Sequence, residues 1–130
     1  MRRLKYLTIV LLLKLLALLP LAAAQRLGAA FGWLAWRLDT KARKVTDINL
    51  DICLPELSDE ERRQLFRDSL RHTGMTALEI PLMWEWPVEK CLGLVRAVEG
   101  EKLLDEALAS DKGLILLAPH LGNWELAGLY

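Results

Sequence analysis

The sequence predicts an α/β fold in which this portion of the chain is mostly helical and contains one strand, over about residues 113–118. Two observations carry that prediction. Residues 114–118 form a short, wholly apolar run directly after a helical segment and a glycine, as strands buried on both faces of a parallel sheet do. Upstream of this run, apolar residues recur at helical spacing, and the first 36 residues are apolar almost throughout.

The composition gives no support for nucleic-acid binding or for a metal site. Hydrophobic residues make up 53% of the 130 residues, which exceeds the roughly 45–50% of an average soluble domain. The 17 basic and 17 acidic residues cancel, so the net charge gives no indication of nucleic-acid binding. Cys53 and Cys91 are far apart, and neither His72 nor His120 has a cysteine nearby. We therefore expect no metal site.

The apolar segment over residues 4–24 fits three kinds of N-terminal structure. A secretory signal peptide would use the basic start of the chain and Ala22–Ala24 as its cleavage site. A spanning helix needs about 20 apolar residues, but Lys14 lies near the middle of this segment. The third interpretation is a retained helix that lies partly in the membrane, with its lysines reaching the headgroups.

The residues after the possible cleavage site favour a retained membrane anchor over residues 1–36. Apolar residues continue, and Trp33 and Trp36 precede a basic cluster over residues 37–44. Tryptophans beside basic residues are typical of the membrane–water interface on the cytoplasmic side. We therefore divide the chain into this anchoring helical segment and the start of an α/β domain, residues 37–130.

A capping box begins the main helix expected in the middle of the chain. Ser58 is followed three residues later by Glu61, and acidic residues fill the first turn. The helix is expected over about residues 58–73, with Gly74 interrupting it. The next apolar stretch contains Pro81 and a second proline, which argue against a long straight helix.

A shorter helix is expected just before the strand. Residues 101–110 have an amphipathic pattern that places Leu103, Leu104 and Leu108 on an inner face. Asp111-Lys112-Gly113 is expected to end this helix, because glycine suits the position after the last helical turn.

A polar motif follows the predicted strand directly, with the sequence Pro-His-Leu-Gly-Asn-Trp-Glu at residues 119–125. Its proline and glycine favour a turn, and Asn123 is a good helix N-cap. His120 would then lie on the loop at the carboxyl end of the strand, where open α/β sheets usually bind ligands. Glu125 would lie in the first turn of the next helix, within reach of the folded-back loop.

A loop histidine beside a carboxylate suits the removal of a proton from a hydroxyl that attacks a thioester. The imidazole of His120 can accept that proton near neutral pH. Glu125 can hold the other ring nitrogen, as the aspartate does in the serine hydrolase triad. The nucleophile would belong to the substrate, so no covalent acyl-enzyme is required. The alternative without catalysis is a loop histidine beside an ordinary helix cap. The full motif, placed between a predicted strand and a helix start, favours a catalytic role.

The motif resembles the signature of the bacterial lipid A biosynthesis acyltransferases, the lauroyl and myristoyl transferases. A second block, formed by Asn49-Leu50, residues 53–58 and Glu61-Arg62, is similar to another family block that usually has Phe where this chain has Leu54. The apolar N-terminus followed by basic residues matches as well. The resemblance covers nearly all 130 residues and implies the N-terminal portion of an α/β acyltransferase fold.

The resemblance also implies a reaction. His120 would be the general base and Glu125 its charge-relay partner, and Asn123 and Trp124 become candidate substrate-binding residues. Acyl carrier protein or coenzyme A would supply the acyl thioester, and the acceptor would be a hydroxyl of an acylated glucosamine disaccharide, the lipid A precursor, without metal or other cofactor. The family works at the cytoplasmic face of the bacterial inner membrane. Glycerolipid acyltransferases share the histidine but generally have Asp where Glu125 stands.

Family members are considerably longer than 130 residues. We therefore expect this chain by itself to be inactive, with a poorly supported C-terminal end. Two alternatives remain open. A secreted helical protein would be cleaved between Ala24 and Gln25. A membrane-anchored interaction module without catalysis would tolerate replacement of His120 and Glu125 but not the loss of residues 1–36.

Overall fold

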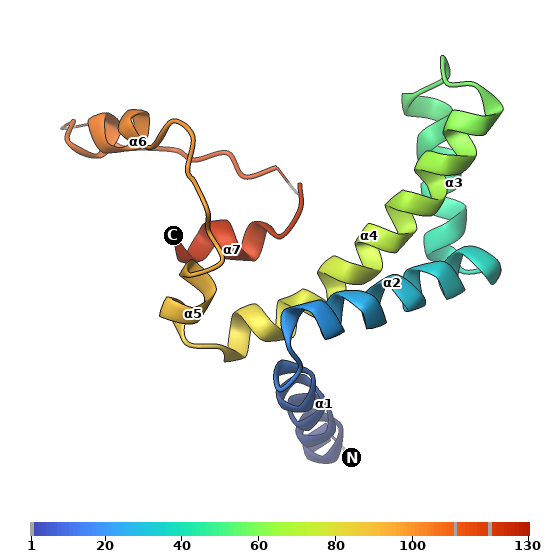
Figure 1. Ribbon diagram of the computed structural model, residues 1–130, viewed down its shortest axis with the longest axis horizontal. Helices are drawn as coiled ribbons and strands as arrows, with labels where there is room; N and C mark the ends of the chain where they lie inside the picture. Colours follow the sequence, from blue (N-terminus) through green and yellow to red (C-terminus); the bar gives the residue numbers. More distant parts are fainter. Residues whose placement is uncertain (1, 111, 120) are drawn as a thin grey trace. The chain divides into compact units, whose positions relative to one another are not determined.

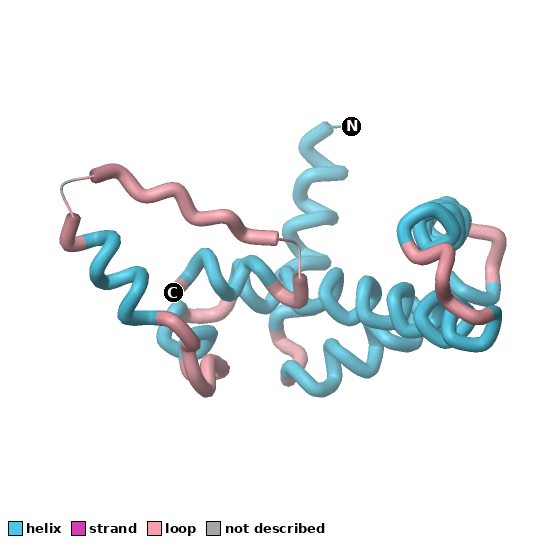
Figure 2. The backbone as a smooth tube through the Cα atoms, turned by 90° about the horizontal axis from the view of Figure 1, so that it is seen from above, coloured by secondary structure: helices cyan, strands magenta, loops and turns pink. Residues whose placement is uncertain are grey.

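The computed structural model describes residues 2–110, 112–119 and 121–130, and these residues form seven helices and no strand (Figures 1 and 2). The chain divides into two compact units, Met1–Glu85 and Trp86–Tyr130. The expectation that this portion is mostly helical is therefore confirmed. The predicted division at residue 36 stays a prediction.

The first unit opens with two helices joined at a sharp bend, α1 (Arg2–Ala17) and α2 (Leu21–Arg37). Pro20, in an extended conformation, is the N-cap residue that precedes α2. Within the described ranges, neither of these helices nor any other has by itself the length and hydropathy of a membrane span, whereas the two together, bent by 120°, do. Lys14 forms an ion pair with Glu85, with 3.0 Å between Nζ and Oε2.

The packing of α2 against α4 (Asp59–Glu85) forms the centre of this unit. The two helices run antiparallel, since Gly28 lies against Gly74 and Gly32 lies against Leu70 (Figure 1). A Cβ atom added to Gly28 would stand 2.3 Å from the carbonyl oxygen of Gly74, and one added to Gly32 would stand 2.3 Å from that of Leu70. The two backbones are therefore in direct contact, which only residues without a side chain permit.

The predicted interruption of the main helix is wrong. α4 continues through Gly74 and Pro81 to Glu85. Gly74 is the point of contact with α2 and not the end of a helix. Pro81 removes one helical hydrogen bond, but Pro81, Leu82 and Met83 are all buried. This burial stabilises the last turns of the helix, because tertiary packing outweighs local propensity.

The predicted capping box is present at the start of α4. The Ser58 N–H donates to Oε2 of Glu61 at 3.0 Å, and the Glu61 N–H donates to the Ser58 hydroxyl at 3.4 Å. The Ser58 hydroxyl also donates to Oε2 of Glu61 at 2.6 Å. These bonds hold the pKa of the Glu61 carboxyl below its ordinary value of 4.5.

A small core lies where α3 (Lys41–Cys53) packs on the first half of α4. Its buried members are Leu50, Phe66 and Leu70, and two partly buried residues pack against them, Trp36 and Leu54. An ion pair between Arg62 and Asp51 joins the same two helices. The core therefore joins the end of α2, the last turn of α3 and the first half of α4.

The second unit contains α5 (Val88–Leu92), α6 (Glu101–Leu108) and α7 (Trp124–Leu129), and α5 packs against α7. α6 confirms the short helix expected from residue 101, and it ends before Asp111-Lys112-Gly113, of which Asp111 lies outside the described residues. Its predicted inner face is wrong, because Leu103 is 72% exposed and Leu108 is 65% exposed. No extensive contact with another described helix covers these side chains.

The predicted strand over residues 113–118 is absent. This segment is irregular, and Figure 2 draws it as a loop. Ile115 and Leu117 are 86% and 90% exposed. A strand must pair its backbone N–H and C=O groups with a neighbouring strand. The described residues contain no second strand with which this segment could pair. An apolar run of strand-like composition therefore does not form a strand here.

Candidate functional site

The candidate catalytic motif lies on the loop that leads into α7. Gly122 has a φ of +61°, in the left-handed region that favours glycine. Just before it, the Leu121 N–H donates to the carbonyl oxygen of Pro119 at 2.7 Å. The turn that the sequence predicts between the apolar run and the helix is therefore present. His120 lies outside the described residues.

The residues after the turn are placed as the sequence predicts. Asn123 is the N-cap residue of α7, and its carbonyl oxygen accepts a hydrogen bond from the Leu126 N–H at 3.2 Å. Glu125 stands in the first turn of the helix and is half-buried. Trp124 is 37% exposed beside it. The structure thus brings Asn123, Trp124 and Glu125 together on one turn, while the pairing of Glu125 with His120 stays a prediction.

An apolar cavity of about 290 Å³ lies against the other face of this helix. It is lined by Val95, Ala97, Val98, Leu126, Ala127 and Tyr130. The hydroxyl of Tyr130 donates to the carboxylate of Glu101, and this bond raises the pKa of Tyr130 above its ordinary value. The bond connects the end of α7 to the start of α6. A cavity with these walls suits a hydrocarbon group better than a polar one.

Potential metal ligands are not gathered in the described part of the chain. Among residues 2–110, 112–119 and 121–130, no three His, Cys, Asp or Glu side chains lie close enough together to hold a metal ion. This observation leaves the expectation of a metal-free reaction as a prediction.

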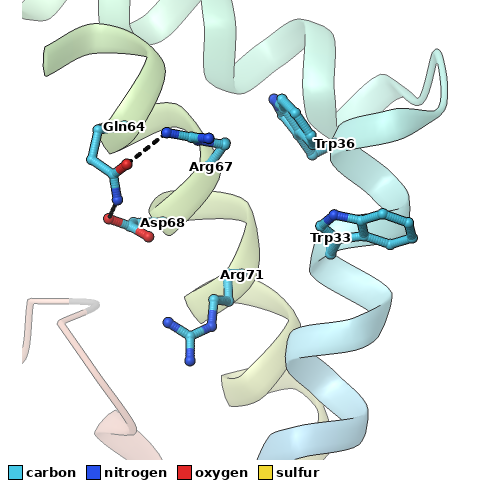
Figure 3. A pocket seen from close by; sticks show the side chains of 6 residues that line it. All are labelled: Trp33, Trp36, Gln64, Arg67, Asp68 and Arg71. Carbon is cyan, nitrogen blue, oxygen red and sulfur yellow. Dashed lines mark hydrogen bonds between the residues drawn. The ribbon is translucent and has the colours of Figure 1, made fainter. Parts of the chain in front are cut away.

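A second hollow, in the first unit, has no counterpart in the sequence analysis. It lies between α2 and α4, has a volume of about 280 Å³, and is lined by Trp33, Trp36, Gln64, Arg67, Asp68 and Arg71 (Figure 3). We call it the Arg–Trp hollow. The spacing of four residues between Arg67 and Arg71 places them on one face of a helix. The sequence could have indicated this shared face through that spacing. The tryptophans opposite it follow only from the way α2 packs on α4.

Comparison with known proteins decides the family. The sequence model of the family described as "Bacterial lipid A biosynthesis acyltransferase" matches residues 1–130. This chain belongs to that family. The matched range includes the motif at residues 119–125 and the second block over residues 49–62.

Individual relatives agree with the family assignment. The chain is 31% identical over 108 residues to the lipid A biosynthesis lauroyltransferase of Escherichia coli K12, an alignment that covers 83% of this chain and 35% of the relative. It is 29% identical over 113 residues to the lipid A biosynthesis palmitoleoyltransferase of the same organism, covering 85% of this chain and 36% of that protein. A lipid A biosynthesis acyltransferase of Haemophilus influenzae is 29% identical over 110 residues, covering 83% and 34%.

The chain therefore spans about a third of the length of the curated lipid A acyltransferases that it matches. No solved structure matches it significantly.

Proposed function

We propose that this chain forms the motif-bearing part of an acyltransferase that moves a fatty acyl chain from a thioester donor to a hydroxyl of a lipid A precursor. The single observation that carries the proposal is the match of the lipid A acyltransferase family to residues 1–130, a range that includes the motif at residues 119–125.

In the proposed reaction, His120 takes the proton from the acceptor hydroxyl as the oxygen attacks the thioester carbonyl. The C–S bond of the resulting tetrahedral intermediate then breaks, and the imidazolium returns the proton to the leaving thiolate, which gives the ester and the free thiol of the donor. Glu125 holds the imidazole in the required tautomer and stabilises the imidazolium that forms. Its position in the first turn of α7, directly after the turn at Gly122, supports this role. Asn123 and Trp124 stand beside Glu125 and contact the substrate.

The donor in this proposal is an acyl thioester of acyl carrier protein or coenzyme A, and no metal or other cofactor takes part. The apolar cavity against α7 supports the binding of a hydrocarbon chain beside the helix that carries Glu125. The site of action is the cytoplasmic face of the bacterial inner membrane. Support for membrane attachment comes from α1, where many apolar side chains are exposed, among them Leu4, Leu7, Leu11 and Leu15.

An acyl-transfer assay on a chimera tests the proposal. Residues 1–130 replace the aligned segment of the E. coli lauroyltransferase, and the chimera is produced in a strain that lacks that enzyme. Membranes of this strain are incubated with a lipid A precursor and with lauroyl-acyl carrier protein or lauroyl-coenzyme A. The mass of the lipid product is measured by mass spectrometry. We expect the precursor to gain one acyl chain. A chimera that reaches the membrane at the level of the parent enzyme but transfers no acyl group from either donor would contradict the proposal.

A further inference from the structure

The Arg–Trp hollow carries an excess of positive charge. Arg67 donates a hydrogen bond to Oε1 of Gln64 at 2.7 Å, and Gln64 in turn donates to Asp68 at 2.6 Å (Figure 3). Asp68 is the one carboxylate in the lining, against the two guanidinium groups of Arg67 and Arg71. A third guanidinium, that of Arg37, lies over the rings of Trp33 and Trp36, although it is not part of the lining.

Arg71, the second arginine of the lining, has no partner within the described part of the chain. Arg71 takes part in no hydrogen bond, ion pair or ring contact there, and its side chain projects from α4 one turn beyond Arg67 (Figure 3). By contrast, Arg63 on the same helix is paired with Glu60 at 3.0 Å. A planar guanidinium with unused donors is a preferred partner for a phosphate group, which it can bind through two parallel hydrogen bonds.

Ring contacts hold the neighbouring guanidinium groups in place before any ligand binds. Arg37 lies 5.1 Å from the ring centre of Trp33 and 5.0 Å from that of Trp36, and Arg67 lies 5.8 Å from Trp36. Cation–π contacts of this length are attractive. The cations are therefore oriented by aromatic rings and are not neutralised by carboxylates, so they remain available to an anion.

The position of the hollow along α2 favours a lipid as the source of that anion. Trp33 and Trp36 stand in the last turns of α2, the polar end of the bent apolar helix pair. Trp33 is itself 54% exposed. Tryptophan and arginine at the end of an apolar helix lie at the depth of lipid headgroups. The exposed ring of Trp33 can therefore contact a lipid at the boundary between its headgroup and its acyl chains.

We propose that the Arg–Trp hollow binds the phosphate group of an anionic membrane phospholipid, with Arg71 as the phosphate ligand and the two tryptophans at the headgroup boundary. The site requires neither His120 nor Glu125, and its existence does not depend on the proposed acyl transfer.

Binding of a short-chain lipid to the chain in dodecyl maltoside micelles tests this site. Isothermal titration calorimetry with dioctanoyl phosphatidic acid compares the parent chain with Arg71→Gln and with the matched control Arg63→Gln, which removes the same charge from the same helix outside the hollow. We expect Arg71→Gln to weaken binding at least about tenfold, because a charge-assisted hydrogen bond is worth on the order of a factor of ten. Arg63→Gln should change the affinity less than about twofold, as an exposed ion-paired charge contributes little.

Two further ligands identify what the site recognises. Dioctanoylglycerol, which has the same acyl chains without phosphate, should bind at least about tenfold more weakly, as should inorganic phosphate without acyl chains. Equal loss of affinity in Arg63→Gln and Arg71→Gln, or no binding of phosphatidic acid, would overturn the site. Equal binding of dioctanoylglycerol would overturn phosphate recognition, and equal binding of inorganic phosphate would overturn the lipid as its source.

Discussion

At the scale of single residues, three glycines set how closely α2 approaches α4. Gly28, Gly32 and Gly74 leave no space for a side chain, because added Cβ atoms would stand 2.2–2.3 Å from backbone oxygen atoms of the other helix. The register that results places Arg67 beside Trp36 and so forms the Arg–Trp hollow. The Gly-xxx-Gly spacing on an apolar helix is a known signal for close helix packing, but it does not reveal the partner helix.

Replacing Gly28 by alanine should destabilise the chain. The methyl group would stand 2.3 Å from the carbonyl oxygen of Gly74 and would force the two backbones apart. Overpacking against backbone costs up to about 3 kcal/mol, of which the better helix propensity of alanine offsets roughly 1 kcal/mol. Denaturant unfolding in mild detergent, followed by circular dichroism, measures the free energy of unfolding. Gly128→Ala is the matched control, since no atom lies within 4 Å of its added Cβ. A Gly28→Ala chain as stable as the parent would contradict the close packing.

At the scale of helices and loops, the sequence predicts the features that depend on neighbouring residues. It does not predict the features that depend on distant parts of the chain. The capping box at Ser58 and the N-cap at Asn123 depend on residues within one helical turn, and both are where the sequence predicts them. The continuation of α4 through Gly74 depends on α2, some forty residues earlier in the chain. The strand expected over residues 113–118 depends on a partner strand, which a single apolar run cannot supply.

The capping box should make the stability of α4 depend on pH. Hydrogen bonds from Ser58 lower the pKa of Glu61 in the folded state below 4.5. The stabilisation is therefore complete above the unfolded pKa and is lost as the pH falls through the lower folded value. We expect the difference in melting temperature between the parent and Glu61→Gln to shrink when the pH is lowered from 7 to 2. In a Ser58→Ala background this pH dependence of the difference should disappear; if it persists, Ser58 is not its cause.

At the scale of the whole molecule, the first two helices distinguish the proposed enzyme from a secreted protein. The proposal needs residues 1–36 to remain on the mature chain, whereas a signal peptide would be removed after Ala24. Mass spectrometry of the protein extracted from membranes should therefore detect peptides from residues 2–24. A mature N-terminus at Gln25 would favour the secreted alternative and contradict a retained anchor.

The part of the candidate site that depends on local backbone preferences can be predicted from the sequence. The turn at Gly122 and the start of α7 follow from backbone preferences of the motif itself, so the sequence places Asn123, Trp124 and Glu125 correctly on that turn. Whether the carboxylate of Glu125 reaches His120 depends on the fold of the loop, and that contact remains a prediction. The Arg–Trp hollow could not be predicted, because its two walls are separated along the chain by α3.

The acyl-transfer rate of the chimera after replacement of each histidine tests the catalytic role of the motif most directly. His120→Ala should lower kcat by about 10²–10⁴-fold, the usual contribution of a general base, with Glu125→Gln lowering it in the same direction. His72→Ala, which removes the exposed histidine on α4, is the matched control and should leave kcat within about twofold of the parent chimera, as expected for a surface substitution. A kcat that is unchanged by His120→Ala, or reduced as much by His72→Ala, would contradict catalysis by the motif.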